Sequence, residues 1–329
     1  MSQKRFEPRP ATAPNNITSP RRKRRDWSGA GVGLFLGLAG LLVARLGWLR
    51  IQLDVFSAFT IQFAILTLAS GIGLLVPRFK SLTASLLFVL GIVAYGLWPS
   101  LTVGADGPTP PGTKRLRLAT YNLDTGQGRE TAVAASLAKL DADVIVITEY
   151  DDSVHSITKA IKELYPFMVP CDDFARCDVA IAARMKVTRV EGLMTSSAAN
   201  AVAVRLGADY NNMMIVGVHS ARFPQSTRQF AQMDNLAQRL AQEIGPMIVA
   251  GDFNATAQSR LVQNFARSLD LNIGVRMPTY PTAWGLPQLA IDQILVRTGI
   301  VPIGPETTGD SAGSDHVPIV RSFAVPLAQ

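Results

Sequence analysis

The chain has 329 residues, which is enough for about two domains, and it carries a formal net charge of +7 at pH 7. This charge is unevenly placed: residues 1–113 hold 12 Lys and Arg against 4 Asp and Glu, whereas residues 114–329 hold 20 against 21. The near-neutral second part argues against a strongly basic nucleic-acid-binding domain, because phosphate contacts dominate such affinity. The excess positive charge belongs to the N-terminal part and bears on topology.

The N-terminal part begins with a polar, basic and Pro-rich segment, residues 1–28, which is expected to be a disordered cytoplasmic tail. Three apolar stretches follow at residues 29–48, 55–76 and 82–98. Each is close to the ~20 residues that a helix needs to cross a bilayer, and aromatic residues lie near their ends. Residues 29–100 are therefore expected to form three transmembrane helices. The alternative is a buried helical bundle in a soluble protein.

Basic residues flank these stretches unevenly. Five of them, residues 21–25, precede the first stretch, and Arg78 and Lys80 lie between the second and third, whereas the first loop offers Arg50. The positive-inside rule then places the N-terminus and the second loop in the cytoplasm and residues 100–329 on the other side. The expected location is the inner (cytoplasmic) membrane, with the C-terminal domain periplasmic or extracellular. The basic run alone would also suit a tail that binds lipid or nucleic acid.

A Pro- and Gly-rich linker is expected at residues 101–113, ahead of a domain at residues 114–329. In this domain short apolar runs typical of strands alternate with longer segments typical of helices, which predicts a mixed α/β fold. Strands are expected at residues 116–121, 144–147, 179–182, 201–204, 214–218, 247–250, 291–296 and 317–320. Helices are expected at residues 130–140, 153–164, 225–244 and 259–269.

The chain has two cysteines, Cys171 and Cys177, and both lie in the domain expected outside the cytoplasm. In an oxidising compartment such a pair can form a disulfide that closes a short loop. The alternative is two unpaired thiols, since sequence does not fix their geometry. A zinc site is not expected, because no further cysteine exists and no histidine lies close in sequence.

Acidic, amide and imidazole side chains recur where the expected strands end. Oxygen ligands of this kind suit Mg²⁺, and nearby His and Asp residues can move protons, so the pattern indicates a metal-assisted phosphate hydrolase. The motifs, in chain order, are Tyr121-Asn122-Leu123-Asp124, Thr148-Glu149, Val218-His219, Gly251-Asp252-Phe253-Asn254, Ile291-Asp292-Gln293-Ile294-Leu295 and Ser314-Asp315-His316.

This ordered set resembles the endonuclease/exonuclease/phosphatase superfamily, whose members include deoxyribonuclease I-like enzymes, over about residues 114–329. Each motif alone is weak, but six in the right order are specific. The resemblance implies an α/β fold, a four-layer sandwich of two mixed β-sheets flanked by helices, here preceded by the three transmembrane helices. It also implies that residues 114–329 are a catalytic domain with its site at the rim of the sandwich.

The resemblance implies a Mg²⁺ cofactor, with Mn²⁺ as an alternative. Glu149 matches the family's main metal ligand, although Thr148 stands before it where many relatives have Gln. Asn122 and Asp124 match the family's Asn-x-Asp motif and would support the metal site, with Asp315 near it. For Asp124 a turn residue is the alternative interpretation, because Asp-Thr-Gly favours a turn.

The remaining motif residues would carry the chemistry. By resemblance, Asp252 aligns or deprotonates the attacking water and Asn254 hydrogen-bonds the phosphate. His219 and His316 would stabilise charge or transfer protons, and Asp292 would orient His316 by accepting a hydrogen bond from its second ring nitrogen. Whether Asp252 or His316 is the formal base stays open at this stage.

Three further residues are candidates for binding the substrate. Arg222 and Arg228 follow His219 closely and would suit a phosphate, although residues of this kind are more often part of a solvated helix face. Trp284 precedes the Ile291-Asp292 motif and would either line a substrate pocket or pack on the core.

These features predict a membrane-anchored, Mg²⁺-dependent phosphoric ester hydrolase, most like a phosphodiesterase, that cleaves a P–O bond by in-line attack of a metal-activated water. The expected substrate is a phosphate ester: a lipid headgroup, another envelope phosphate or DNA. No obligate protein partner is indicated. The alternatives are an extracellular or periplasmic deoxyribonuclease and a non-catalytic membrane-tethered binding module. The apolar stretches lack Asp, Glu and Lys in their interiors, which favours anchoring over transport.

Overall fold

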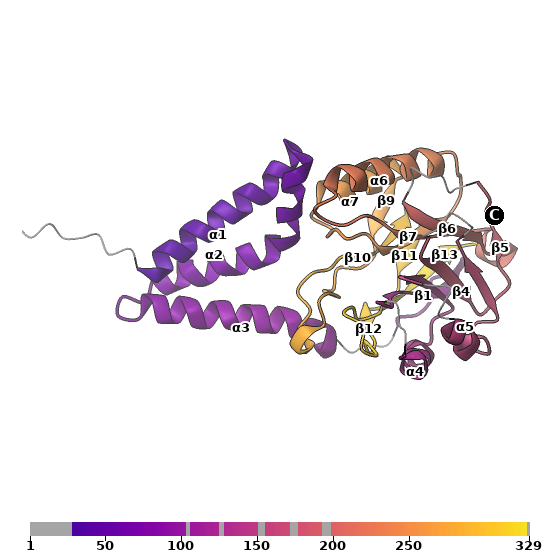
Figure 1. The fold of residues 1–329 in the computed structure, drawn as a ribbon, viewed down its shortest axis with the longest axis horizontal. Helices are drawn as coiled ribbons and strands as arrows, with labels where there is room; N and C mark the ends of the chain where they lie inside the picture. The colour runs from indigo at the N-terminus through magenta and orange to yellow at the C-terminus, as the bar shows by residue number, and fades with distance from the viewer. Residues whose placement is uncertain are drawn as a thin grey trace, which may run out of the picture.

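The computed structural model describes residues 28–102, 106–124, 128–150, 155–171, 177–192 and 199–327. The expected basic tail, apart from Ser28, lies outside the described residues. A bundle of helices forms one end of the molecule and an α/β domain forms the other (Figure 1). The chain therefore has the two-part organisation that its hydropathy indicates.

The bundle consists of three long helices joined by short segments: α1 (Gly29–Arg45), α2 (Thr60–Leu74) and α3 (Lys80–Leu101). Two 3₁₀ segments, η1 (Leu46–Trp48) and η2 (Ile51–Phe59), connect α1 to α2. With these segments included, the described residues contain three helices long and apolar enough to cross a membrane, of 20, 24 and 22 residues.

The helices pack closely because glycines line the contact between α1 and α2. A Cβ atom added at Gly33, Gly37 or Gly40 would collide with Ser70, Thr67 or Phe63 of α2, respectively. Small residues spaced in this way let two helix backbones approach each other, which is how helices associate where water supplies no hydrophobic driving force.

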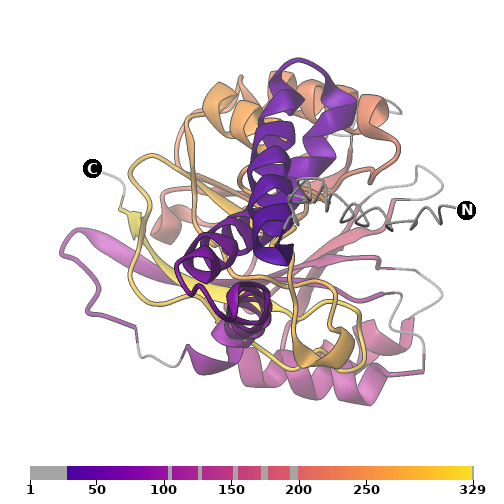
Figure 2. The same ribbon diagram turned by 90° about the vertical axis from the view of Figure 1, so that its left-hand side faces the viewer.

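The second helix differs from its expected boundaries. The apolar pattern predicted a continuous span at residues 55–76, but α2 begins only at Thr60. Residues Ile51–Phe59 form η2 instead, which runs across the domain end of α1 and α2 (Figure 1). Figure 2, viewed from the bundle end, shows the purple helices of the bundle in front of the domain.

The domain contains two β-sheets packed face to face. The first sheet has strand order β11-β13-β1-β2-β4-β3 with β12 paired to β13, and the second has order β5-β6-β7-β8-β10-β9. The strands of the first sheet are β1 (Thr113–Asn122), β2 (Val144–Thr148), β3 (Phe167–Pro170), β4 (Val179–Ala183), β11 (Val301–Pro302), β12 (Thr307–Thr308) and β13 (Ile319–Pro326). Those of the second are β5 (Thr188–Arg189), β6 (Asn200–Arg205), β7 (Met214–His219), β8 (Met247–Asp252), β9 (Leu271–Ile273) and β10 (Asp292–Arg297).

Helices cover the outer face of each sheet and complete four layers. Helices α4 (Glu130–Leu140) and α5 (His155–Ile161) pack on the first sheet, and α6 (Ser226–Leu240) and α7 (Arg260–Ser268) pack on the second. A third apolar cluster fills the space between the two sheets. The mixed four-layer sandwich that the motifs imply is therefore confirmed.

Strand register brings the motif residues to one edge. Strand β1 is parallel to β2, with Asn122 opposite Thr148, and β7 is parallel to β8, with His219 opposite Asp252. Antiparallel pairing then places Asp292 at the start of β10 opposite Asp252. Since parallel strands end at the same edge, polar residues far apart in sequence are brought together there.

The domain is held against the bundle by hydrogen bonds. The Asp54 carboxylate in η2 accepts hydrogen bonds from the backbone N–H groups of Arg260 (2.8 Å) and Leu261 (3.2 Å), at the N-terminus of α7. Elsewhere, Gln288 donates to the Ile92 carbonyl of α3 at 3.2 Å. An anionic cap at a helix N-terminus satisfies otherwise unpaired N–H groups.

The expected linker is attached to the domain as well, although residues 103–105 lie outside the described part. The buried carboxylate of Asp106 forms ion pairs with Arg115 and Arg117 of β1 and accepts a hydrogen bond from Ser322 of β13 at 2.6 Å. The described end of this segment is therefore anchored to the first sheet.

Candidate active site

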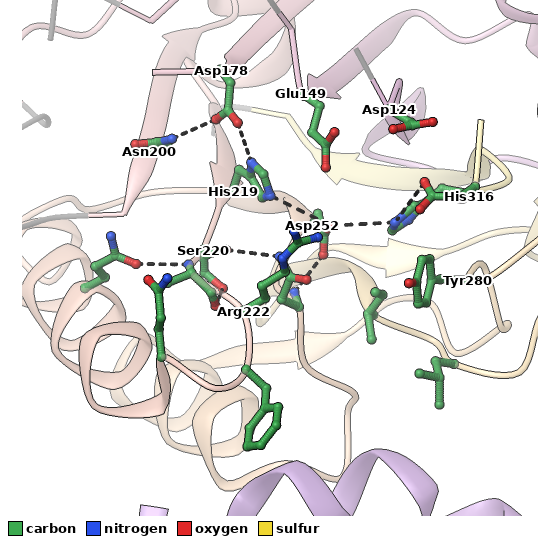
Figure 3. Close-up of a pocket in the computed structure, with 18 of the residues that line it drawn as sticks. Asp124, Glu149, Asp178, Asn200, His219, Ser220, Arg222, Asp252, Tyr280 and His316 are labelled. Carbon is green, nitrogen blue, oxygen red and sulfur yellow. Dashed lines mark hydrogen bonds and ion pairs between the residues drawn. The ribbon is translucent and has the colours of Figure 1, made fainter. Parts of the chain in front are cut away.

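A cavity of about 1010 Å³ lies where the motif strands end (Figure 3). Nine of the residues expected to bind metal, to catalyse the reaction or to bind substrate line it: Asp124, Glu149, His219, Arg222, Arg228, Asp252, Asn254, Asp315 and His316. Asn122 and Asp292 lie directly behind these residues and are buried. The structure thus brings the expected metal and catalytic residues into one site.

Asn122 connects the two carboxylates at the centre. Its amide nitrogen donates to Glu149 at 3.1 Å and to Asp252 at 3.0 Å, and its oxygen accepts from the backbone N–H of Asp124 at 2.9 Å. Glu149 adopts φ 53, a left-handed conformation uncommon for a non-glycine residue. The turn that follows β2 therefore directs the Glu149 carboxylate into the cavity (Figure 3).

His316 and Asp292 form a buried pair. The His316 Nδ1 atom lies 2.7 Å from Asp292, which fixes the ring so that Nε2 faces Asp252 at 3.9 Å. Burial alone would lower the pKa of His316, but the charge and hydrogen bond of Asp292 and the charge of Asp252 raise it to about 9. The expected orienting role of Asp292 matches this geometry, and the ring of Tyr280 packs 4.8 Å from His316.

His219 has an equivalent partner that the sequence did not reveal. Its Nδ1 atom lies 2.8 Å from Asp178, which also accepts a hydrogen bond from Asn200 at 2.7 Å. The Nε2 atom of His219 faces Asp252 at 4.0 Å. Burial would lower the pKa of His219, whereas the hydrogen bond to Asp178 and the charge of Asp252 raise it to about 9.

Asp252 lies between the two imidazoles and is 1% exposed. Burial and the charge of Asp292 raise the pKa of Asp252, while His316 and His219 oppose that shift. A carboxylate with a raised pKa accepts a proton more readily than a free aspartate. The arrangement of one buried carboxylate between two imidazolium groups suits proton transfer around a negatively charged substrate.

Two groups of side chains could hold a metal ion. Potential ligand atoms of Asp252, Asp292 and His316 lie within 4.8 Å of one another. In that group, however, the His316 Nδ1 atom and the Asp292 carboxylate are already paired with each other at 2.7 Å. Glu149, by contrast, lines the cavity and forms no ion pair among the described residues.

The donor set around Glu149 fits a hard divalent cation. Glu149 and Asp124 offer carboxylate oxygens at the cavity wall, Asn122 offers an amide oxygen behind them, and Asp315 is exposed nearby with its carboxylate 3.9 Å from His316. Oxygen-only ligation of this kind is what Mg²⁺ or Mn²⁺ prefers. This donor set fits the sequence-based ligand assignment, which stays a prediction.

The residues expected to contact the phosphate, Asn254, Arg222 and Arg228, differ in the hydrogen bonds that they already form. The Asn254 backbone N–H donates to Asp252 at 2.7 Å, but its side-chain amide donates to the Ser220 carbonyl at 3.0 Å. Arg222 lines the cavity, and Arg228 lines it while donating to Gln225 at 3.2 Å. Asn254 therefore has part of its hydrogen-bonding capacity committed, and Arg222 points toward the cavity centre (Figure 3).

Trp284 is not brought to the site. It lies in the short 3₁₀ turn η5 (Ala283–Gly285), is 96% exposed and does not line the described cavity wall. Both expected placements, in a substrate pocket and on the core, were therefore wrong. The two cysteines are joined in a disulfide, and Cys177 lies at the cavity wall directly before Asp178.

The family model of the Endonuclease/Exonuclease/phosphatase family matches residues 119–316, which is more than half of the chain. The chain belongs to this family. All six motifs fall within the matched region, from the strand that carries Asn122 to His316 at its end. The family match and the two-sheet fold therefore agree over the same part of the chain.

Individual relatives are more distant. A UPF0294 protein from Yersinia pseudotuberculosis is 31% identical over 115 residues, which is 34% of this chain and 42% of that protein, so the chain matches less than half of its length. An endonuclease/exonuclease/phosphatase from Bacteroides vulgatus superposes with TM-score 0.52 at 16% identity, covering 64% of this chain and 98% of that one. Beta toxin from Staphylococcus aureus, solved with bound magnesium ions, gives TM-score 0.51 at 15% identity over 63% and 99%.

Sequence reasoning missed Asp178, Tyr280 and the residues of η2 that line the cavity. A signal for Asp178 exists: β4 is antiparallel to β2, with Val179 opposite Thr148, so the start of β4 meets the end of β2. Polar residues that precede an antiparallel strand reach the same edge as those that follow a parallel one. No comparable pattern marks Tyr280 or η2.

Proposed function

We propose that the protein is a membrane-anchored, divalent-metal-dependent phosphodiesterase. The observation that carries this proposal is Asn122, which hydrogen-bonds Glu149 at 3.1 Å and Asp252 at 3.0 Å and so couples a cation site to a proton-transfer site in one cavity. Two imidazoles flank the same cavity. A non-catalytic binding module would have no need of this coupling.

Glu149 is the proposed principal ligand of Mg²⁺ or Mn²⁺, supported by Asn122, Asp124 and Asp315. When bound there, the cation neutralises charge on a phosphoryl oxygen and on the departing oxygen. In beta toxin of Staphylococcus aureus magnesium ions are bound on a similar fold, which supports the same choice here.

Protein side chains perform the proposed proton transfers. Asp252 accepts a proton from the water whose oxygen forms the new bond to phosphorus, while the P–O bond on the opposite side breaks. His219 and His316, both cationic at neutral pH, donate hydrogen bonds to the phosphate oxygens, and one of them supplies the proton to the departing alkoxide. Asp178 and Asp292 hold these rings in position.

The proposed location is the inner (cytoplasmic) membrane, with the N-terminus in the cytoplasm and the domain periplasmic or extracellular. Three helices of sufficient length and apolarity support anchoring. The basic residues Arg78 and Lys80 lie at the bundle end opposite the domain, where the positive-inside rule expects the cytoplasm. Labelling of single cysteines introduced at residue 77 and at the exposed Asp209 in intact and permeabilised cells tests this orientation.

The activity test uses the purified full-length protein in detergent with bis-p-nitrophenyl phosphate. Turnover should require Mg²⁺ or Mn²⁺, stop with EDTA, and fall at least about a hundredfold in Asp252→Ala and His316→Ala. Matched variants of exposed residues outside the site, such as Asp209→Ala, should retain wild-type rates. Absence of hydrolysis from a folded, metal-saturated protein would favour the binding-module alternative.

A further inference from the structure

The active-site cavity is not built from the catalytic domain alone. Val55, Ala58 and Phe59 of η2, in the N-terminal bundle, contribute an apolar wall to the same cavity that holds Glu149 and His219. In Figure 3 a ribbon in the faint purple of the N-terminal bundle lies along the edge of the site opposite Asp178 and Glu149. The cavity is therefore amphipathic, with catalytic polar groups on one side and membrane-bundle side chains on the other.

The apolar wall begins where the membrane helices begin. Phe59 is the last residue of η2 and directly precedes Thr60, the first residue of α2. The η2 segment runs across the domain end of the bundle (Figure 1). If α1, α2 and α3 span a bilayer, η2 lies at its surface, and the cavity opens at the depth of the headgroups.

A second contact joins the domain to α3. Leu286 abuts α3 at Gly96, since a Cβ added there would lie 2.9 Å from the Leu286 Cβ. Gln288 is hydrogen-bonded to Ile92 of the same helix, within the candidate span Lys80–Leu101. Trp284 is two residues from Leu286 and is 96% exposed. Tryptophan is enriched where a membrane meets water, so this position suits the interface of a bilayer.

The wall is held rigidly enough to act on a substrate. Asp54 of η2 accepts from the backbone of Arg260 and Leu261, and Ser57 of η2 accepts from Thr256 at 3.5 Å. Both Asp54 and Ser57 are buried in this contact. Phe59 keeps 40% of its surface exposed, so its ring is available beside the cavity.

We propose that η2 is part of the substrate site and that the substrate is a phosphoester lipid of the adjoining leaflet, whose hydrocarbon portion contacts Val55, Ala58 and Phe59 while its phosphate reaches the polar wall. This inference rests on the proposed phosphodiesterase function. The near-neutral charge of residues 114–329 and the apolar wall both disfavour DNA, whose binding depends on phosphate neutralisation along a strand.

The test measures how inhibition depends on chain length. Ethyl, butyl and octyl phosphate are compared as inhibitors of bis-p-nitrophenyl phosphate hydrolysis by the full-length protein held in amphipol. If hydrocarbon contacts η2, each methylene should strengthen inhibition about two- to fourfold. Phe59→Ala should weaken this dependence on chain length. Relative to the wild type, inhibition by octyl phosphate should weaken about tenfold or more compared with inhibition by ethyl phosphate.

Phe56→Ala is the matched control, because Phe56 lies in the same segment, is 38% exposed and does not line the described cavity. It should keep the wild-type chain-length dependence. The inference would be overturned if ethyl and octyl phosphate inhibited the wild type equally. It would also be overturned if inhibition depended on chain length in the same way in the wild type, Phe59→Ala and Phe56→Ala. Cleavage of plasmid DNA but not of phosphatidylethanolamine–phosphatidylglycerol vesicles, unaffected by Phe59→Ala, would also overturn it.

Failure of the proposed function gives a different result. If the wild type does not hydrolyse bis-p-nitrophenyl phosphate with any metal, the phosphodiesterase proposal fails, and the chain-length dependence is read from calorimetric binding of the same three alkyl phosphates. Binding that strengthens with chain length in Phe56→Ala but not in Phe59→Ala would then still support η2 as a lipid-binding wall. Binding independent of chain length would refute it.

Discussion

Replacing Asp178 with Asn tests whether the unanticipated His219–Asp178 pair sets the protonation of His219. The hydrogen bond is 2.8 Å long and His219 is 16% exposed, so the interaction is shielded from solvent. A hydrogen bond to a charged group contributes about 1.5–3 kcal/mol, and about 1.4 kcal/mol corresponds to one pKa unit. Asp178→Asn should therefore lower the pKa of His219 from about 9 to roughly 7–8.

The assay is the pH dependence of kcat/KM. In the wild type His219 stays cationic through neutral pH, so activity should fall only as pH rises through about 9. In Asp178→Asn the pKa of this alkaline limb should fall by about one to two units, which corresponds to roughly a two- to tenfold loss of kcat/KM near pH 8. Asp209→Asn, which neutralises an exposed carboxylate paired with Lys114, is the matched control and should leave the limb in place.

The same pair links stability to pH. Because the folded-state pKa of His219 is raised above its ordinary value of 6.5, its stabilising contribution is complete below about pH 6.5 and is lost as pH rises through about 9. The difference in melting temperature between wild type and Asp178→Asn should thus be largest near pH 6, where both Asp178 and His219 are charged, and should shrink above pH 9 and in strong acid, where the Asp178 carboxylate is protonated. An alkaline limb that stays at the same pH in the variant would refute the assigned role of Asp178.

Three further predictions follow from local geometry. Glu149→Gln should remove the rise in melting temperature produced by Mg²⁺ or Mn²⁺ and lower kcat roughly a hundred- to a thousandfold, as measured by thermal shift and turnover. Gly251→Ala should cost at least about 2 kcal/mol in urea unfolding, because φ is 139 and its Cβ would collide with the Val218 carbonyl, whereas an unchanged midpoint would contradict that strain. Replacing Cys171 and Cys177 together with Ser should lower stability by roughly 2 kcal/mol, as expected for a disulfide that closes a short loop; calorimetry with and without reductant checks this, and only the wild type should respond.

Hydrophobic patterning was sufficient for the long elements of the domain. The helix at residues 130–140 has the predicted boundaries, and each of the eight expected strands exists within a few residues. Short strands such as β5 and β9 were missed because two or three residues carry no periodicity; their conformation depends on pairing with β6 and β10. The second apolar α-helix begins later than predicted, because composition cannot show that the first part of the apolar segment turns across the bundle as η2.

The candidate site was predictable where a side chain follows a strand and less so elsewhere. Glu149, His219 and Asp252 were identified because each directly ends or follows an apolar run. Asp178 precedes its strand, and Trp284 was misassigned because nearness in sequence to Asp292 does not give nearness in space: η5 projects to the exposed side of its loop. To predict tertiary contacts of this kind from sequence, the order of the strands in the sheet must be known as well as their positions in the chain.

The contact between η2 and α7 distinguishes a bundle fixed to the domain from a flexible tether. A flexible tether would leave the cavity open on every side, and anchoring would only raise the local concentration of substrate. Here the Asp54 carboxylate caps α7, and residues of the same segment form a wall of the cavity. Since capping a helix N-terminus with a buried carboxylate fixes both partners, removing the bundle would remove part of the cavity as well as the attachment. We therefore expect the bundle and the candidate site residues to act as one functional unit, so that an activity assay on the isolated domain would sample an incomplete cavity.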